Sequence, residues 1–302
     1  MTPELPLRHN VFLYESDDEY VERSVEFLRE GLEAGEGAIV TNARAGLAGM
    51  RDALGDDAHR VTFVDVSQTY TRPAQAVAAY YGTLLEQLRS APSVRAVADM
   101  QLGPADEAFE VWTGYEAICN AAYAHLPAWV VCTYNANGLP DQVLEAALRT
   151  HTDVLSDDWA PSRRYEDPRA VLREVTPDPE PLPELRSFSV GDDLELFRER
   201  LAGELVADRV PEATALEMLV AATEVAANAV RHGGGIAEVR MGRSDGRFVC
   251  EVIDRGTGFD DPLAGYLVPR DGIGTGLWVA RQLAWRLEFL HSPAGFTARL
   301  WV

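Results

Sequence analysis

Apolar and polar positions follow two alternating periods along residues 1–155. Short apolar runs typical of buried strands are followed by longer segments whose apolar residues recur three and four positions apart, the period of a helix. In segment 19–33, for example, the apolar residues stand at 21, 25, 27, 28 and 32. The pattern predicts strands over 10–14, 37–41, 61–65, 94–100 and 129–134, and helices over 19–33, 44–54, 73–88, 107–124 and 140–155. This alternation predicts an α/β domain with a largely parallel sheet.

The order of elements changes in the last part of the chain. The pattern there predicts a strand over 187–190, helices over 192–206 and 212–231, and a hairpin of strands 236–242 and 247–254 that turns at residues 244–246. An irregular stretch over 255–272 precedes a helix over 275–285 and strands near 287–291 and 296–302. Helices on one face of a mixed, mostly antiparallel sheet make this part α+β.

Prolines separate the two parts. Residues 160–186 follow neither period, and Pro177, Pro179, Pro181 and Pro183 occupy alternate positions. Such a run continues neither a helix nor a central strand, and it favours an extended, semi-rigid chain. The sequence therefore predicts a first domain over 1–160, a linker over 161–182 and a second domain over 183–302.

Composition sets limits on the class of protein. The chain has 302 residues, of which 47% are hydrophobic and 25% charged, as in soluble globular proteins of two domains. Its net charge of −21 argues against binding to nucleic-acid phosphates or to an anionic membrane surface. We find neither a leader-like start nor a run of 18 apolar residues, so we expect a cytoplasmic protein.

The cysteines and histidines of the chain follow no metal-ligand spacing. Three cysteines lie far apart at 119, 132 and 250, which favours reduced thiols in the core. His9, His125 and His151 could in principle gather a metal with Cys119 and Cys132. Because their spacing matches no ligand pattern, we expect ordinary core or surface roles for them.

Three short segments in the second part carry candidate chemistry. In the first, Glu224 and Asn228 stand four apart and His232 eight apart, so the three share one stripe of a helix. A carboxamide such as Asn228 suits Mg²⁺, and Glu224 could accept a proton from an attacking hydroxyl. The alternative is a polar stripe that only faces water.

The second and third segments are rich in glycine. Asp254 ends a predicted strand and is followed by Gly256, Gly258 and Phe259, so its carboxylate could accept a hydrogen bond from an exocyclic amine such as that of adenine. A plain Asp-Gly turn would look the same. The third segment leads directly into a helix whose N-terminus suits a triphosphate, and it comprises Gly272, Gly274, Thr275, Gly276 and Leu277.

Together, and in this order, the three segments resemble the N, G1 and G2 boxes of the GHKL ATPase superfamily. Residues 183–302 are most similar to the anti-sigma-factor serine kinases of bacteria. The resemblance implies a GHKL (Bergerat) ATP-binding sandwich with ATP and Mg²⁺ as cofactors. It implies Glu224 as the general base, Asn228 as the metal ligand and Asp254 as the adenine acceptor. Residues 259–271 would form a lid over phosphates held by the third segment. Arg255 and Arg270 border this pocket, where each could either reach a phosphate or simply face water.

The first part resembles the MEDS sensory domain, a RecA-like module. The resemblance rests on residues 9–14, 27–40, 139–144 and 149–151. No Gly-x4-Gly-Lys-Ser/Thr segment occurs in the chain, so a phosphate-binding loop of that kind is missing. We therefore interpret the domain as a sensor or docking module.

Three functions stay open at this point. The first is an anti-sigma regulatory factor with protein serine/threonine kinase activity, whose partners would be a sigma factor and a STAS-type antagonist, and which could form a homodimer. The second is a sensor histidine kinase, although residues 148–152 do not place His151 as a dimerisation helix requires. The third is a non-catalytic module in which ATP only sets the conformation. Binding and phosphoryl transfer use the same boxes, so the sequence does not separate the first function from the third.

Overall fold

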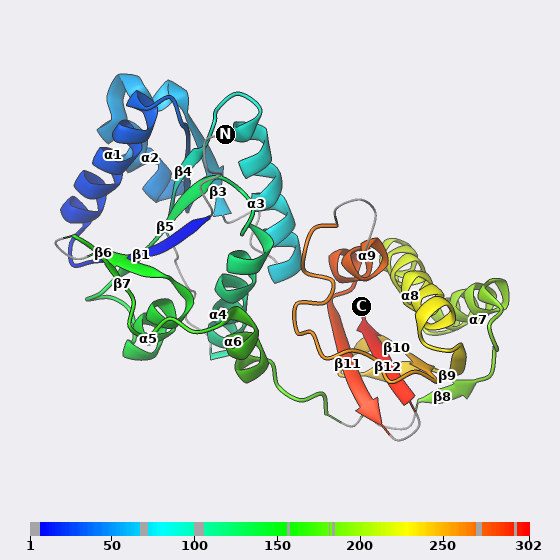
Figure 1. Cartoon of the computed structure of the whole chain (residues 1–302). Coiled ribbons are helices and arrows are strands. Elements are labelled where there is room, and N and C mark those ends of the chain that lie inside the picture. Colours follow the sequence, from blue (N-terminus) through cyan, green and yellow to red (C-terminus); the bar gives the residue numbers. More distant parts are fainter. Residues whose placement is uncertain are drawn as a thin grey trace. The chain divides into compact units, whose positions relative to one another are not determined.

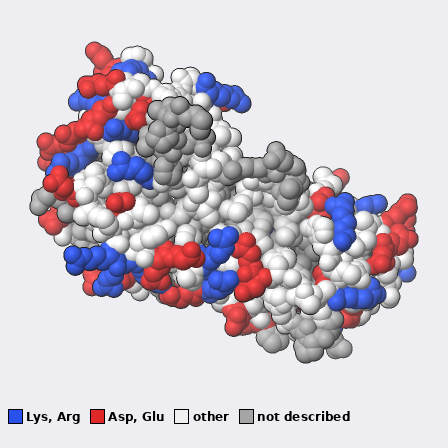
Figure 2. Space-filling view, viewed as in Figure 1, with Lys and Arg blue, Asp and Glu red and all other residues white. Residues whose placement is uncertain are grey.

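The chain folds into two compact units, residues 1–176 and 177–302. The structure is a computed structural model, and it describes residues 7–66, 72–99, 106–155, 158–180, 182, 185–269, 274–292 and 295–302. Figure 1 shows a sheet with helices in each unit. On the face drawn in Figure 2, the coloured basic side chains are interspersed with acidic ones and form no continuous basic area, which fits the net charge of −21.

The first unit is built on a seven-stranded sheet in the order β3-β2-β4-β5-β1-β6-β7. Its strands are β1 (Arg8–Tyr14), β2 (Gly37–Asn42), β3 (Val61–Asp65), β4 (Val94–Asp99), β5 (Ala128–Asn135), β6 (Asp153–Leu155) and β7 (Trp159–Pro161). All neighbours pair in parallel except β6 and β7, which are antiparallel. Strands β1, β4 and β5 are buried along most of their length, as expected for parallel strands covered by helices. The predicted parallel sheet is confirmed, whereas the RecA-like detail stays a prediction.

The direction of each crossover places the helices of the first unit. Its helices are α1 (Asp17–Glu33), α2 (Arg44–Leu54), α3 (Pro73–Leu88), α4 (Asp106–Ala122), α5 (Asp141–Thr150) and α6 (Pro168–Val175), with a 3-10 helix over Gly55–Arg60. The connections through α1 and α2 run toward the β3 edge, and those through α3, α4 and α5 run the opposite way. Right-handed crossovers then place α1 and α2 on one face and the other three on the opposite face. The packing agrees, since α1 contacts α2 while α3 and α5 both contact α4.

The end of the first unit differs from the prediction. The helix predicted over 140–155 ends at Thr150, and residues 153–155 instead pair with β1 as strand β6. Residues 161–176 were expected in the linker, yet α6 packs against α4 and buries Val171 and Leu172. Its start is capped by Asp167, whose side chain accepts from the amides of Arg169 and Ala170. The first compact unit therefore extends beyond residue 160, to Thr176.

The second unit has a five-stranded antiparallel sheet in the order β11-β12-β10-β9-β8. Its strands are β8 (Arg186–Phe188), β9 (Ile236–Ser244), β10 (Arg247–Asp254), β11 (Arg286–Ser292) and β12 (Gly295–Trp301). The turn between β9 and β10 has positive φ at both Asp245 and Gly246, 49° and 76°, which is the geometry of a tight hairpin turn. The predicted α+β unit is confirmed.

Three helices cover one face of this sheet in Figure 1: α7 (Leu194–Ala207), α8 (Glu212–His232) and α9 (Thr275–Leu283). Their core joins Phe197 and Leu201 of α7 and Met218 of α8 to Val239 and Phe248 of the sheet. By length and composition alone, α8 could also span a membrane. Seven of its residues are buried inside this unit, so here it is a core helix.

Candidate functional site

The first candidate residues lie on α8 beside its buried face. Val225, Ala226 and Ala229 are buried in the core of the second unit, whereas Glu224 and Asn228 are half-buried and one helical turn apart. The spacing predicted from the sequence therefore brings a carboxylate and a carboxamide together. His232 is the last residue of the helix, and it is exposed.

The start of α9 lies against these two side chains. A Cβ on Gly276 would stand 2.9 Å from Oε2 of Glu224 and 3.1 Å from Nδ2 of Asn228, so a side chain here would push into both. Gly274 occupies the N-cap position with φ 77° and ψ 7°, and no side chain caps the helix. Gly274, Thr275, Gly276 and Leu277 thus bring the positive end of a helix dipole beside Glu224 and Asn228. Gly272 lies outside the described residues.

Asp254 lies at the C-terminal end of α8, next to Gly233. It is the last residue of β10 and is 9% exposed. The Gly256 amide donates to its Oδ1 at 2.8 Å, and a Cβ on Gly233, which caps the end of α8, would overlap its carboxylate. Burial raises the pKa of Asp254, and the backbone amides of Gly256 and Phe296 oppose that rise only in part. A buried carboxylate of this kind would be a strong acceptor for an amine donor that reaches it.

Glycines bring the backbone close to Asp254. A Cβ on Gly256 would lie 3.0 Å from Cα of Gly233, and a Cβ on Gly258, whose φ is 68°, would overlap the Phe296 ring. The Phe259 ring packs against both Phe289 and Phe296, with 4.9 Å between ring centroids in each pair. No side chain larger than glycine therefore fits at 256 or 258 without moving the chain.

Arg281 holds the described part of the predicted lid against α9. Its Nε donates to the carbonyl of Ala264 at 2.6 Å, and its guanidinium lies 4.0 Å from the centroid of the Tyr266 ring. A Cβ on Gly265, where φ is 78°, would stand 2.7 Å from the Leu277 carbonyl oxygen. Arg281 was not predicted from the sequence. The feature that could have indicated it is its four-residue spacing from Leu277, which puts both residues on one face of α9. Of the predicted lid, 270 and 271 lie outside the described residues.

Of the two arginines predicted to border the nucleotide pocket, the structure describes only Arg255. Nη1 of Arg255 reaches the Gly234 carbonyl at 3.4 Å and Asp192 at 3.9 Å, so it lies at the Asp254 end of the stripe. Gly233 and Glu224 are nine residues apart on α8, about 14 Å along the axis. Arg255 therefore does not lie beside Glu224. Arg270 falls outside the described residues.

Comparison with known families agrees with this division of the chain. Residues 8–152 match the family model of the MEDS domain, the methanogen/methylotroph, DcmR sensory domain. Residues 191–301 match the family model of the histidine kinase-like ATPase domain. The chain therefore carries an N-terminal MEDS domain followed by a C-terminal ATPase domain of the GHKL type, a type that implies ATP binding.

A solved structure gives a more distant similarity. The crystal structure of the RsbU and RsbW domains of Rv1364c from Mycobacterium tuberculosis is 19% identical, with a TM-score of 0.30. The similarity covers 65% of this chain and 46% of that one, so this chain spans less than half of its length. A similarity of this size assigns neither fold nor function. None of the curated proteins matches the chain.

Proposed function

We propose that the chain is an anti-sigma regulatory factor with ATP-dependent protein serine/threonine kinase activity, controlled by its N-terminal sensory domain. The observation that carries the proposal is the contact between Gly276 at the start of α9 and the pair Glu224 and Asn228 on α8. A helix N-terminus that favours phosphate, a carboxamide that suits Mg²⁺ and a carboxylate that can accept a proton meet at one place.

The nucleotide would lie along the side of α8 that carries Glu224 and Asn228. Asp254 accepts a hydrogen bond from the exocyclic amine of adenine, and Gly256, Gly258 and Phe259 form the surface beside the ring. At the opposite end, the amides of Gly274 to Leu277 hold the phosphates, with Gly272 as part of the same segment. His232, at the end of α8, contributes to the nucleotide site.

Glu224 is the general base in this proposal. It accepts the proton of a serine or threonine hydroxyl as that oxygen attacks the γ-phosphorus and ADP leaves. Asn228 supplies the carboxamide oxygen for Mg²⁺, which would neutralise charge on the phosphates. Half-burial of both side chains supports these roles, since each is reachable yet sheltered from bulk water.

The proposed partners are a sigma factor and a STAS-type antagonist that carries the accepting hydroxyl, as in partner-switching control of bacterial transcription. The proposal also includes a cytoplasmic location and a homodimer. The first unit, residues 1–176, would sense a signal, and the segment that begins at Pro177 would pass it to the kinase domain over 183–302. The domain type supports ATP use, and the identity of the partners is the part that experiment has to supply.

Incubation with γ-labelled ATP tests the proposal. The full chain is mixed with Mg²⁺ and STAS-type antagonist proteins encoded by the same genome, and the labelled residue is identified by mass spectrometry. We expect phosphoserine or phosphothreonine on an antagonist. Phosphohistidine would point instead to a histidine kinase, and bound ATP without transfer to any protein would mark a non-catalytic module.

A further inference from the structure

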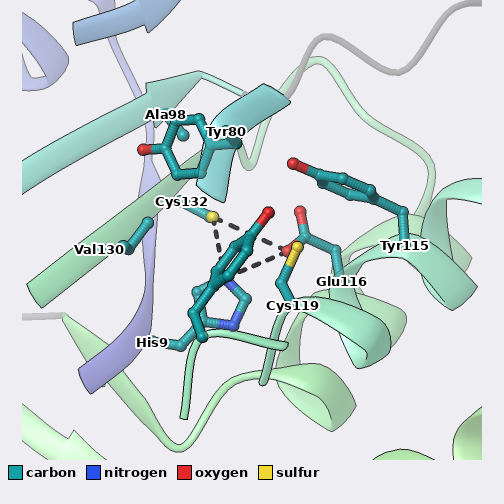
Figure 3. Close-up of a pocket in the computed structure, with 9 residues that line it drawn as sticks. His9, Tyr80, Ala98, Tyr115, Glu116, Cys119, Val130 and Cys132 are labelled. Atoms are coloured by element: carbon teal, nitrogen blue, oxygen red, sulfur yellow. Dashed lines mark hydrogen bonds and ion pairs between the residues drawn. The ribbon is translucent and has the colours of Figure 1, made fainter. Parts of the chain in front are cut away.

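Four buried side chains of the first unit converge on one point. His9 comes from β1, Cys132 from the neighbouring strand β5, Glu116 from α4, and His151 directly follows α5. One ligand atom from each lies within 4.8 Å of all the others. None of the four is more than 3% exposed. Figure 3 shows the His9, Glu116 and Cys132 side chains directed toward one another from three different elements.

Four of the separations between these ligand atoms lie near those of a tetrahedral metal site. Oε2 of Glu116 lies 3.2 Å from Nε2 of His9, 3.7 Å from Nε2 of His151 and 3.8 Å from Sγ of Cys132. Nε2 of His9 lies 3.3 Å from the same sulfur. Zinc–nitrogen bonds of about 2.0–2.1 Å and zinc–sulfur bonds of about 2.3 Å place the ligand atoms of a tetrahedron about 3.3–3.6 Å apart. The two other pairs, which join His151 to His9 and to Cys132, lie within 4.8 Å, so the His151 ring would have to move inward to complete such a site.

Hydrogen bonds outside the cluster direct both imidazole lone pairs into it. Asn120 donates through Nδ2 to the carbonyls of Glu116 and Thr150, so its Oδ1 is the acceptor for Nδ1–H of His9 at 3.2 Å. Nδ1–H of His151 donates to the carbonyl of Ala147 at 2.7 Å. Both Nε2 atoms are then unprotonated in the neutral rings. A second ring nitrogen bonded to a carbonyl or amide oxygen is the usual arrangement behind metal-bound histidines.

His151 supplies an independent sign that something is bound. Its ring is fully buried, and within the described residues its Nε2 has no hydrogen-bond partner. A buried polar atom without a partner is costly, so it calls for an unseen proton, water or ion. Glu116 is also held from outside the cluster, because the Tyr134 hydroxyl donates to its Oε1 at 3.1 Å. Its other oxygen, Oε2, is then left to face the cluster.

We propose that His9, Glu116, Cys132 and His151 form a closed Zn²⁺ site in the core of the sensory domain. Mixed nitrogen, sulfur and oxygen ligands suit zinc, and four protein ligands leave no open position, as in structural sites. The Cys132 thiolate and the Glu116 carboxylate carry two negative charges, so the bound ion makes the buried site neutral. Binding replaces the thiol proton of Cys132 by a metal–sulfur bond and releases that proton to solvent.

The cavity beside the cluster fits a single ion better than an organic ligand. Its lining includes His9, Glu116, Cys119 and Cys132, and it has room for about one water-sized sphere. Of the residues considered from the sequence, Cys119 and His125 do not join the cluster. His125 bonds the Tyr81 hydroxyl at 3.0 Å instead. Cys119 therefore offers a matched control, since it is a second buried thiol at the same cavity.

The test uses the full-length chain and two metal ions. We expect about one Zn²⁺ per purified chain, kept through dialysis and removed by a strong chelator. Replacement by Co²⁺ should give the intense visible bands of a tetrahedral ion and a thiolate-to-cobalt charge-transfer band. Cys132→Ser should abolish the charge-transfer band, and Glu116→Gln should weaken the tetrahedral bands. Cys119→Ser should leave both unchanged.

Several outcomes would overturn the proposal. One is a folded wild-type chain that takes up neither Zn²⁺ nor Co²⁺, because then the cluster is only a buried histidine–carboxylate network. Another is a charge-transfer band that survives Cys132→Ser or disappears with Cys119→Ser. If a variant fails to fold, the wild-type cobalt spectrum still decides, since an octahedral spectrum without a sulfur band excludes the site.

Discussion

Replacing Asp254 by asparagine should weaken ATP binding with little effect on the fold. The asparagine has the same shape, and its carbonyl oxygen can still accept from the Gly256 amide, the bond that Oδ1 makes at 2.8 Å. What the variant loses is the negative charge that faces the adenine amine. Because Asp254 is only 9% exposed, water does not readily replace that interaction.

The size of the effect follows from the type of bond. A hydrogen bond to a charged group contributes about 1.5–3 kcal/mol, somewhat more than one between neutral groups. Each 1.4 kcal/mol corresponds to about tenfold in the dissociation constant, so ATP affinity should fall by roughly 10- to 100-fold. The apo variant should also lose the unfavourable burial of a charge, the cause of the raised pKa of Asp254. The thermal unfolding midpoint of Asp254→Asn without ATP should therefore stay the same or rise.

Titration calorimetry of the full-length chain with Mg-ATP measures this loss. Asp245→Asn is the matched control, since Asp245 lies in the hairpin turn at the other end of β10, about 30 Å away along the strand. Asparagine tolerates the positive φ of that turn, so the control should bind ATP as the wild type does. Unchanged ATP affinity in Asp254→Asn would refute the assignment of the adenine acceptor. An equal loss in both variants would show that the effect is not local.

Three further predictions concern the same site. Glu224→Gln should keep ATP bound but lower phosphoryl transfer by about 10²–10⁴-fold, whereas the control Glu217→Gln, two turns earlier on α8, should leave both unchanged. Normal phosphoryl transfer by Glu224→Gln, or a loss of ATP binding as large as the loss of transfer, would show that Glu224 is not the base. Gly276→Ala should displace the Glu224 carboxylate, because the new Cβ would stand 2.9 Å from Oε2, and so reduce transfer, whereas Gly203→Ala on α7 meets no atom within 4 Å and should leave transfer unchanged. Because the folded-state pKa of Asp254 is raised, its protonation stabilises the fold without ATP at low pH, and that contribution is lost as the pH rises through this pKa. ATP binding needs the charged carboxylate, so ATP affinity should fall as the pH drops through the same pKa. A wild type without this pH dependence, or Asp254→Asn with the same dependence, would contradict the assignment.

The sequence pattern predicted most elements because their signals are local. Helix 73–88 begins with a proline, which suits the first turn, and its predicted bounds match Pro73–Leu88 of the structure. The hairpin at 244–246 was predicted from an Asp-Gly pair, and both residues have the positive φ that such a turn requires. Capping and turn chemistry of this kind acts within a few residues, so a single sequence records it.

The short elements after Thr150 were not predicted because they depend on distant partners. Residues 153–155 are too few to show a strand pattern in the sequence. They form a strand only because they pair with β1, which lies near the start of the chain. Likewise, α6 lies in a proline-rich stretch and is stabilised by burial of Val171 and Leu172. Tertiary contacts override local propensity in both places.

The candidate sites show the same contrast. Glu224, Asn228 and Asp254 could be proposed from the sequence because a helical stripe and a strand end are visible in it. Glu116 was missed, since nothing in its helix marks a carboxylate as buried until the fold brings His9 and His151 to it. Ligands gathered from separate elements, with no fixed spacing, are recognised only when the topology is known.

Separate expression of the two units tests the central claim most directly. Residues 1–176 and residues 177–302 are purified apart, their folding is checked by circular dichroism, and Mg-ATP is titrated into each and into the full chain. We predict that 177–302 folds alone and binds Mg-ATP, because its core is its own, while 1–176 binds no nucleotide tightly. Nucleotide binding to 1–176 alone, or a folded 177–302 that binds no ATP, would contradict the account.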